Sequence, residues 1–201
     1  MQNPDTLLYA VHNLFWTTFG VTLLILKLRY RRAAEGASPA PVSKETHTAG
    51  FSRAFLAFHM VAFGVMYFGI FNAVQRQRVP FWFARQRISG TIVVAIGVVL
   101  MVSALTYFRS WRFRATLDQG HQLATGGPFR ILRHPIYMAL NLLALGSAIW
   151  VPTPILWIAA VLMAVGSDLR GRAEERILED AFGDSYRDYR RRTARFLPGI
   201  Y

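Results

Sequence analysis

The stretch 126–137, GGPFRILRHPIY, lies where a basic loop meets the start of an apolar segment. Its two glycines and first proline predict a tight turn. Four side chains in or just after the stretch follow one another at steps of four, three and four residues, and so would share one face of a helix: Arg130, His134, Tyr137 and Asn141. Charged groups that enter a membrane helix are costly unless paired, which makes a functional site the default hypothesis for this stretch.

Composition places the chain among membrane proteins. Its 201 residues are enough for one domain, and 53% of them are hydrophobic while only 17% are charged, against about 25% charged in typical soluble domains. The mean hydropathy is +0.27. The chain has no cysteine, which excludes a disulfide framework, a thiolate nucleophile and a cysteine-ligated metal site.

The net charge of +12 is better explained by a membrane than by nucleic acid. The basic residues mostly flank apolar segments, where they face lipid headgroups and set topology. The sequence has no RNA-binding sheet motif and no zinc-finger spacing. The N-terminus also lacks the charged n-region of a cleavable signal peptide, so we expect the first apolar run to remain as a span.

The hydropathy pattern predicts an all-α integral membrane protein with about five transmembrane helices. The expected spans are 7–28, 54–74, 88–108, 135–150 and 155–166. Gly90 and Gly97 in the third span allow close helix approach. The fourth and fifth spans are short, and the prolines between them predict a tight antiparallel hairpin. A charged amphipathic helix follows over 171–192, with a kink or break at Gly183. We expect one membrane domain over 1–201.

Lysine and arginine counting predicts the orientation. The loops at 29–53 and 109–133, the span ends beside them and the C-terminal tail hold 19 of the 23 basic residues, and 76–87 holds the other four. This bias predicts an outside N-terminus and a cytoplasmic C-terminus. We expect a bacterial inner membrane protein.

Two carboxylates on the C-terminal helix complete the candidate site. Glu174 and Glu175 lie at the same predicted membrane boundary as the Arg/His stretch. Carboxylates opposite such a cluster either hold a zwitterionic ligand or form an ion-pair clamp between two helices with no ligand. The residues alone leave both interpretations open.

The two halves together resemble a known family. GPFR at 127–130 and RHPIY at 133–137 are followed by EE at 174–175, FG at 182–183, two tyrosines at 186 and 189, and RFLP at 195–198. In this order the motifs resemble the isoprenylcysteine carboxyl methyltransferase family, over about residues 123–198. The first three spans, 1–108, match only as membrane helices.

The resemblance implies an integral membrane methyltransferase that uses S-adenosyl-L-methionine, bound by the half at 109–201. A lipophilic, small-molecule or lipid-linked substrate would enter from the bilayer. The residues that the resemblance assigns to the cofactor are Gly127, Pro128, Arg133, His134, Tyr137, Glu174 and Glu175. We assign catalytic roles to Arg130 and Glu175. Ala139 replaces a glycine that is frequent in the family, which we expect to alter packing against the cofactor.

Methyl transfer from a sulfonium is a direct displacement, so the protein chiefly positions two partners and excludes water. No protein nucleophile or metal is required. A carboxylate acceptor needs no base, whereas a thiol or amine needs one, for which His134 or a glutamate would serve; carboxylate and thiol acceptors are favoured. Two other classes stay open: an NADPH-dependent membrane reductase of the sterol-reductase type, and a non-enzymatic membrane adaptor.

Several other polar residues have structural interpretations. We interpret His59, within the second span, as a hydrogen-bonded packing residue, and Asp168 as the ion-pair partner of Arg172. For Tyr186 and Tyr189, an interfacial role and a site role stay equally open. The arginines at 190–192 indicate headgroup binding or topology rather than catalysis.

Overall fold

The computed structural model describes residues 4–34, 48–75, 84–107 and 123–200. In these residues the chain forms six α-helices, one short 3-10 helix and no β-strand. The elements in order are α1 (Pro4–Ala34), α2 (Thr48–Gln75), α3 (Ala84–Tyr107), η2 (Gly127–Arg130), α4 (Pro135–Trp150), α5 (Pro154–Phe182) and α6 (Asp184–Arg192). The all-α prediction is therefore confirmed for the described part of the chain.

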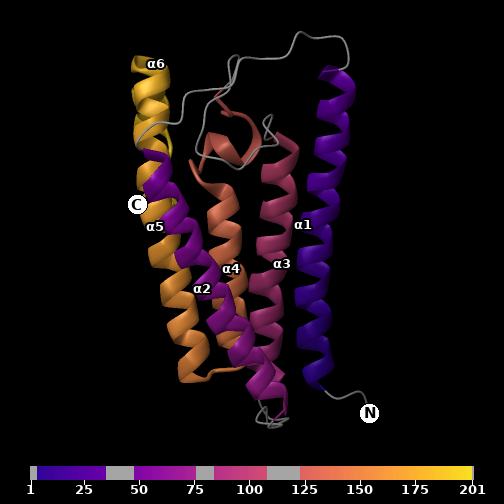
Figure 1. The fold of residues 1–201 in the computed structure, drawn as a ribbon. Coiled ribbons are helices and arrows are strands. Elements are labelled where there is room, and N and C mark those ends of the chain that lie inside the picture. The colour runs from indigo at the N-terminus through magenta and orange to yellow at the C-terminus, as the bar shows by residue number, and fades with distance from the viewer. Residues whose placement is uncertain (1–3, 35–47, 76–83, 108–122, 201) are drawn as a thin grey trace.

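The five long helices run side by side and alternate in direction (Figure 1). α3 packs on α4, α2 packs on α5, and α1 joins the bundle through α3. The end of α3, η2, the start of α4, the end of α5 and α6 all lie at one end of the bundle, which we call the η2 end. The turn between α4 and α5 lies at the opposite end.

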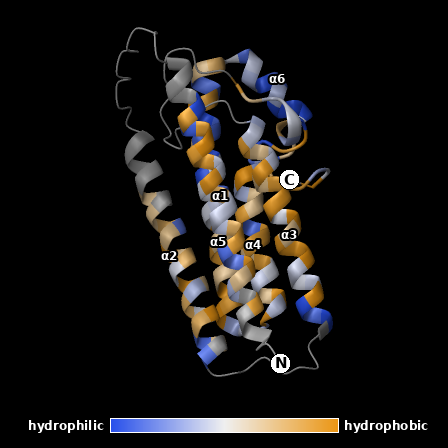
Figure 2. Cartoon of the chain, turned by 90° about the vertical axis from the view of Figure 1, so that its right-hand side faces the viewer, coloured by the Kyte–Doolittle hydropathy of each residue, from blue (hydrophilic) through white to orange (hydrophobic). Residues whose placement is uncertain are grey.

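The helices have the apolar composition that a membrane requires. Three of them are long and apolar enough to cross a bilayer, over Tyr9–Arg29, Arg85–Tyr107 and Pro154–Phe182, and two shorter apolar helices cover Ala57–Ala73 and Pro135–Trp150. Large apolar side chains such as Val99 are exposed along the bundle. Figure 2 shows the hydrophilic residues concentrated on α6 and near helix ends. These features support an integral membrane protein.

Glycines bring α3 and α4 into close contact, as predicted. A Cβ on Gly90 would lie 2.7 Å from the carbonyl oxygen of Gly146, and one on Gly97 would lie 3.1 Å from that of Ala139. Ala139 is fully buried. Its backbone faces α3, so the alanine belongs to the contact between α3 and α4.

The C-terminal half departs from the prediction in one respect. The fourth and fifth segments do form a hairpin, but α5 continues without interruption to Phe182, whereas the sequence predicted a short span ending near residue 166 and a separate helix from 171. Glycine weakens a helix interior by about 1 kcal/mol without breaking it. The chain does break at Gly183, as predicted, where φ is +52°. The fall in hydropathy near residue 170 therefore separates an apolar part and a charged part of the same helix.

A chain of neutral hydrogen bonds crosses the interior of the bundle and links α1, α2 and α4. Trp16 donates to the Tyr67 hydroxyl, which lies 3.2 Å from His12 Nδ1. His12 Nε2 lies 2.7 Å from Ser147 Oγ, and Ser147 donates to the Leu143 carbonyl at 2.7 Å. Because the tyrosine and serine oxygens each have one proton to give, the chain is satisfied when Tyr67 donates to Nδ1 and Nε2 donates to Ser147. We call these residues the His12 chain.

Candidate functional site

The stretch that opens the site is a turn followed by an extended segment. Gly127 has φ +54°, and its α-carbon faces the ring of Tyr107 so closely that a Cβ would overlap it. The peptide N–H of Phe129 closes the turn on the Gly126 carbonyl at 3.1 Å. Glycine is the residue that adopts such a backbone without steric cost. The turn predicted at 126–128 is therefore present.

The segment between η2 and α4 pairs with the C-terminal segment. Leu132 forms a parallel bridge with Ala194. The Arg133 N–H donates to the Ala194 carbonyl at 2.8 Å, and the Ala194 N–H donates to the Ile131 carbonyl at 2.9 Å. This pairing brings residues 193–196 against the start of α4, a contact that no local pattern in the sequence predicted.

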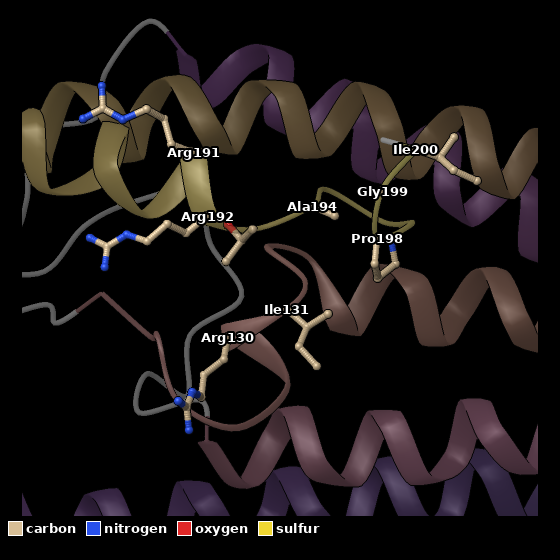
Figure 3. A pocket seen from close by; sticks show the side chains of 9 residues that line it. Arg130, Ile131, Arg191, Arg192, Ala194, Pro198, Gly199 and Ile200 are labelled. Atoms are coloured by element: carbon tan, nitrogen blue, oxygen red, sulfur yellow. The ribbon is translucent and has the colours of Figure 1, made fainter.

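The pairing also corrects the predicted helical face. Arg130 is the last residue of η2, and α4 begins only at Pro135. The four side chains predicted to share one face therefore belong to different elements. Arg130 is exposed and lies in an open groove beside Arg191 and Arg192 (Figure 3). The structure does not bring it to either glutamate.

Glu175 is buried and is held by three side chains from two segments of the chain, residues 133–134 and residue 195. Its carboxylate accepts from Arg133 Nε at 2.8 Å and from Arg195 Nε at 3.0 Å and Nη2 at 2.7 Å. His134 Nε2 lies 3.3 Å from the same carboxylate. We call these four residues the Glu175 cluster. Only 4% of Glu175 is exposed, so the cluster leaves little carboxylate surface for a ligand.

The arginines of this cluster also have further partners. Arg133 donates from Nη1 to the Arg190 carbonyl at 3.1 Å and to the Thr193 carbonyl. Arg195 reaches Asp168 at 3.0 Å. Asp168 also pairs with Arg172 at 2.7 Å, which confirms the predicted ion pair. The Glu175 cluster therefore fastens the segment after α6 to α4 and α5.

Glu174 has a different environment from its neighbour. The Tyr137 hydroxyl donates to its carboxylate at 2.5 Å, Arg170 Nε lies 3.1 Å away, and His134 Nδ1 lies 3.7 Å away. About 24% of the Glu174 side chain is exposed. His134 thus stands between the two glutamates, and Glu174 is the one that retains accessible surface.

An aromatic stack extends this arrangement toward α2. The ring of Tyr137 stacks with that of His134, with centroids 5.6 Å apart, and with that of His59, with centroids 5.8 Å apart. His59 Nε2 lies 3.2 Å from Ser167 Oγ, and Ser167 donates to Asn141 at 2.7 Å. His59 is hydrogen-bonded, as predicted, but the structure also places it against a site residue. Asn141 lies at the inner end of this chain.

Both tyrosines of α6 are buried. The Tyr189 hydroxyl donates to the Phe129 carbonyl at 2.8 Å. The Tyr186 side chain is fully buried, and its hydroxyl has no hydrogen-bond partner among the described residues. Burial, with the negative charge of Glu175 as a further cause, raises the pKa of both phenols well above the usual value, so both are neutral. Of the two interpretations left open by the sequence, burial favours a place in the site.

Sequence reasoning missed three residues of this region: Arg170, Arg195 and, as a site neighbour, His59. Arg195 was visible in the RFLP motif but had no partner that spacing alone would show. Within the residues that the structure describes, no group of three histidine, aspartate or glutamate side chains is arranged to hold a metal ion.

Comparison with known proteins identifies the family. Residues 85–185 match the phospholipid methyltransferase family. The chain belongs to this family. The match covers α3, η2, α4, α5 and the start of α6, and so contains both glutamates and the Arg133–Tyr137 stretch. His59 and Arg195 lie outside it.

Individual relatives agree with this assignment. The chain is 29% identical over 124 residues to a probable protein-S-isoprenylcysteine O-methyltransferase from each of two Oryza sativa subspecies, covering 60% of this chain and 64% of each relative. It therefore spans less than two thirds of their length. It is also 31% identical over 169 residues to the cobalt-zinc-cadmium resistance protein CzcN of Cupriavidus metallidurans, covering 77% of this chain and 72% of that relative. The predicted resemblance to isoprenylcysteine methyltransferases is confirmed.

Proposed function

We propose that the chain is an integral membrane methyltransferase that uses S-adenosyl-L-methionine and methylates a lipophilic acceptor, most simply a carboxylate or a thiol. Family membership supports methyl transfer, and the apolar helices support the membrane. The observation that carries the proposal is the meeting of the two sequence motifs: His134 and Tyr137 on one side contact Glu174 and Glu175 on the other, across 37 to 41 residues of chain.

The residues present fit a polar, partly cationic cofactor at the η2 end. The buried Tyr186 hydroxyl has no partner among the described residues, and a buried polar group of this kind costs about 1–3 kcal/mol unless something pairs with it. Glu174 supplies an accessible carboxylate, which suits an ammonium or a ribose hydroxyl. We assign Glu174, His134, Tyr137, the Tyr186 hydroxyl and the Gly127–Pro128 backbone to cofactor binding.

This assignment changes the roles of two predicted residues. Glu175 is saturated by His134, Arg133 and Arg195, so we propose that it positions His134 rather than touching the reacting atoms. Arg130 lies in the exposed groove, which argues against the catalytic role predicted from the sequence. The sequence left two interpretations open for these glutamates, an ion-pair clamp and a ligand site. We propose that Glu175 forms the clamp and that Glu174 binds the ligand.

The chemistry asks little of the protein beyond positioning. The bound cofactor supplies a methyl group on a sulfonium, and transfer is a displacement that requires alignment and exclusion of water. Tyr137 stacks with His134 and His59, which are both buried, and this packing helps to exclude water beside Glu174. An ionised carboxylate acceptor needs no base. For a thiol acceptor, Glu174 or His134 would accept the proton.

We further propose that α1 to α5 all cross the membrane, with the η2 end and α6 at the cytoplasmic surface of a bacterial inner membrane. α4 has 16 residues and is short for a span, but it packs between α3 and α5. The excess of basic residues in segments at the η2 end supports this orientation.

Two tyrosines give a matched test of the cofactor proposal. Calorimetric titration of S-adenosylhomocysteine into the detergent-purified protein should show binding, and NADPH should show none. Tyr186→Phe should weaken binding about five- to tenfold without lowering the thermal stability of the unliganded protein, because the hydroxyl that it removes is buried without a partner among the described residues. Tyr189→Phe should lower stability, because it loses the bond to Phe129, and should change affinity less.

The possible outcomes separate the three function classes. No binding of S-adenosylhomocysteine to folded protein would reject the proposal, and binding of NADPH in its place would favour a reductase. If neither S-adenosylhomocysteine nor NADPH raises the melting temperature, the result would favour a non-enzymatic membrane adaptor.

A further inference from the structure

An open groove lies on the outer side of the η2 end, separate from the Glu175 cluster. Its volume is about 460 Å³, and it is lined by Arg130, Ile131, Arg191, Arg192, Thr193, Ala194, Pro198, Gly199 and Ile200. Pockets of a few hundred Å³ hold small ligands or headgroups. Neither the family match nor the proposed function gives this groove a role.

The groove is cationic at one end and apolar at the other. Figure 3 shows Arg130, Arg191 and Arg192 toward one side of the groove, with their side chains pointing in different directions, and Ile131, Pro198 and Ile200 toward the other. The apolar side lies in the direction in which the long helices of the bundle extend, and the arginines lie away from it. The polarity of the groove therefore follows the axis of the bundle.

Two of the three arginines have no counter-charge among the described residues. Arg191 pairs with the Asp188 carboxylate. Arg192 donates to the backbone carbonyl of Asp188 at 3.2 Å, and Arg130 is exposed. Neither Arg130 nor Arg192 makes an ion pair within the part of the chain that the structure describes. The cationic end thus retains two positive charges beside one neutralised arginine.

The apolar end exposes large side chains to the surroundings. Ile131 is 58% exposed and Ile200 is 80% exposed. Exposing these two isoleucines to water is unfavourable, whereas beside a bilayer they would contact lipid acyl chains.

The floor of the groove is held rigidly. The bridge between Leu132 and Ala194 runs beneath it, with backbone bonds on both sides of the bridge. The Ile200 N–H also donates to the Leu197 carbonyl at 3.1 Å, across the positive-φ Gly199. The arginines and the isoleucines therefore project from one fixed surface.

We propose that this groove binds an anionic phospholipid, with the phosphate of its headgroup between Arg130 and Arg192 and the start of its acyl chains along Ile131 and Ile200. Guanidinium groups bind phosphate oxygens through paired, charge-assisted hydrogen bonds. A lipid oriented in this way has its chains alongside the bundle and its charge beyond it, which matches the polarity of the groove. The site is distinct from the proposed cofactor site and does not depend on it.

The test compares two charge-matched double variants. The full-length protein in neutral detergent is titrated with short-chain phosphatidylglycerol, with phosphatidylcholine of equal chain length and with inorganic phosphate, and bound lipid is counted by native mass spectrometry. Arg130→Gln with Arg192→Gln should weaken phosphatidylglycerol binding about 20- to 30-fold, since each basic residue near an anionic headgroup accounts for about a fivefold change. Arg176→Gln with Arg187→Gln removes the same charge from exposed positions outside the groove and should change binding less than twofold.

A third variant distinguishes a lipid from a free phosphate. Ile131→Ser leaves the charge unchanged and should still weaken phosphatidylglycerol binding severalfold, while millimolar inorganic phosphate should not displace the lipid. Equal losses in the two double variants, equal binding of phosphatidylcholine, or full displacement by inorganic phosphate would each overturn the proposal. All substituted positions are exposed, so the unliganded variants should melt at the wild-type temperature.

Discussion

The Glu175 cluster and the His12 chain are both buried polar networks, but they are built from different groups. The Glu175 cluster, at the η2 end, consists of a carboxylate, two guanidinium groups and an imidazole. The His12 chain lies about 18 Å further along α4, from Pro135 to Ser147 at about 1.5 Å per residue, and consists of neutral donors and acceptors only.

The difference teaches where this protein tolerates charge. In the orientation that we propose, the Glu175 cluster lies near the lipid headgroups, where a buried ion pair remains close to water and to counter-ions, whereas deep in the bilayer a charged side chain costs several kcal/mol. In the His12 chain each donor has an acceptor among neutral groups, so its hydrogen bonds are satisfied without any charged side chain. The η2 end, where charges are available, is also where a charged cofactor is best bound.

The largest expected effect is on the Glu175 cluster. Glu175→Gln should lower the free energy of unfolding by about 3–5 kcal/mol, because it removes the carboxylate that neutralises Arg133 and leaves Arg195 with Asp168 as its ion-pair partner. The matched control is Glu179→Gln, which removes a carboxylate from partly exposed pairs and should cost about 0–1 kcal/mol. Unfolding in detergent–denaturant mixtures measures both. Equal losses would mean that the cluster is not a clamp.

Substitution of Glu174 tests whether the two neighbouring glutamates have different roles. Glu174→Gln should lower the affinity for S-adenosylhomocysteine about 10- to 100-fold, the range for loss of a charge-assisted hydrogen bond. Glu174 also pairs with the buried Arg170, but its own side chain is partly exposed, so we expect a smaller loss of stability than in Glu175→Gln. Calorimetry on folded protein measures the affinity. If affinity stays unchanged here but falls in Glu175→Gln at a temperature where that variant is folded, our division of roles is wrong.

Alkaline pH probes the phenols beside the Glu175 cluster. The pKa of Tyr186 is raised by burial in the folded chain, while in the unfolded chain it lies near 10. The stability that this phenol contributes is therefore fully present below about pH 10. It falls as the pH rises further, by up to about 1.4 kcal/mol per pH unit. Tyr186→Phe should make the decline of thermal stability above pH 10 shallower. Parallel curves for the variant and the wild type would contradict a buried, neutral phenol.

The smallest expected effect is on the His12 chain. Ser147→Ala leaves His12 Nε2 without its acceptor and should cost about 1 kcal/mol, the scale of hydrogen bonds between membrane helices. Thr22→Ala is the control, since Thr22 bonds only to a carbonyl of its own helix and its loss leaves no other side chain without a partner. A cost of 3 kcal/mol or more for Ser147→Ala would show that the deep network is as critical as the charged one.

The fold was predictable wherever a pattern is local. Apolar runs located α1 to α4 within a few residues, and the prolines at 152 and 154 located the turn of the hairpin. The prediction failed at residues 166–171, where two glycines and a fall in hydropathy suggested a break. Gly166 packs against Phe58 and His59, and Gly171 packs against His134. These glycines serve close helix contacts that no single-helix pattern reveals.

The members of the candidate site were predictable only in part, and their connections were not. His134, Tyr137 and Glu174 were identified from the motifs and meet in the structure. Arg130 was predicted from a helical face that does not exist, because the backbone pairs with residue 194 before α4 begins. Arg195 was missed for the same reason, since its position depends on the pairing of Leu132 with Ala194, which are 62 residues apart in the chain.

By itself the sequence determined the membrane class, the all-helical fold, the family and the two motifs, because periodicity, hydropathy and residue spacing are properties of short stretches of chain. Only the tertiary structure decided which of two adjacent glutamates is locked and which is accessible. Along α5 they differ by one residue and therefore by about 100° of rotation. That rotation turns Glu175 toward the arginines from the other segments and leaves Glu174 beside Tyr137, and the choice depends on how α4, α5 and the C-terminal segment pack together.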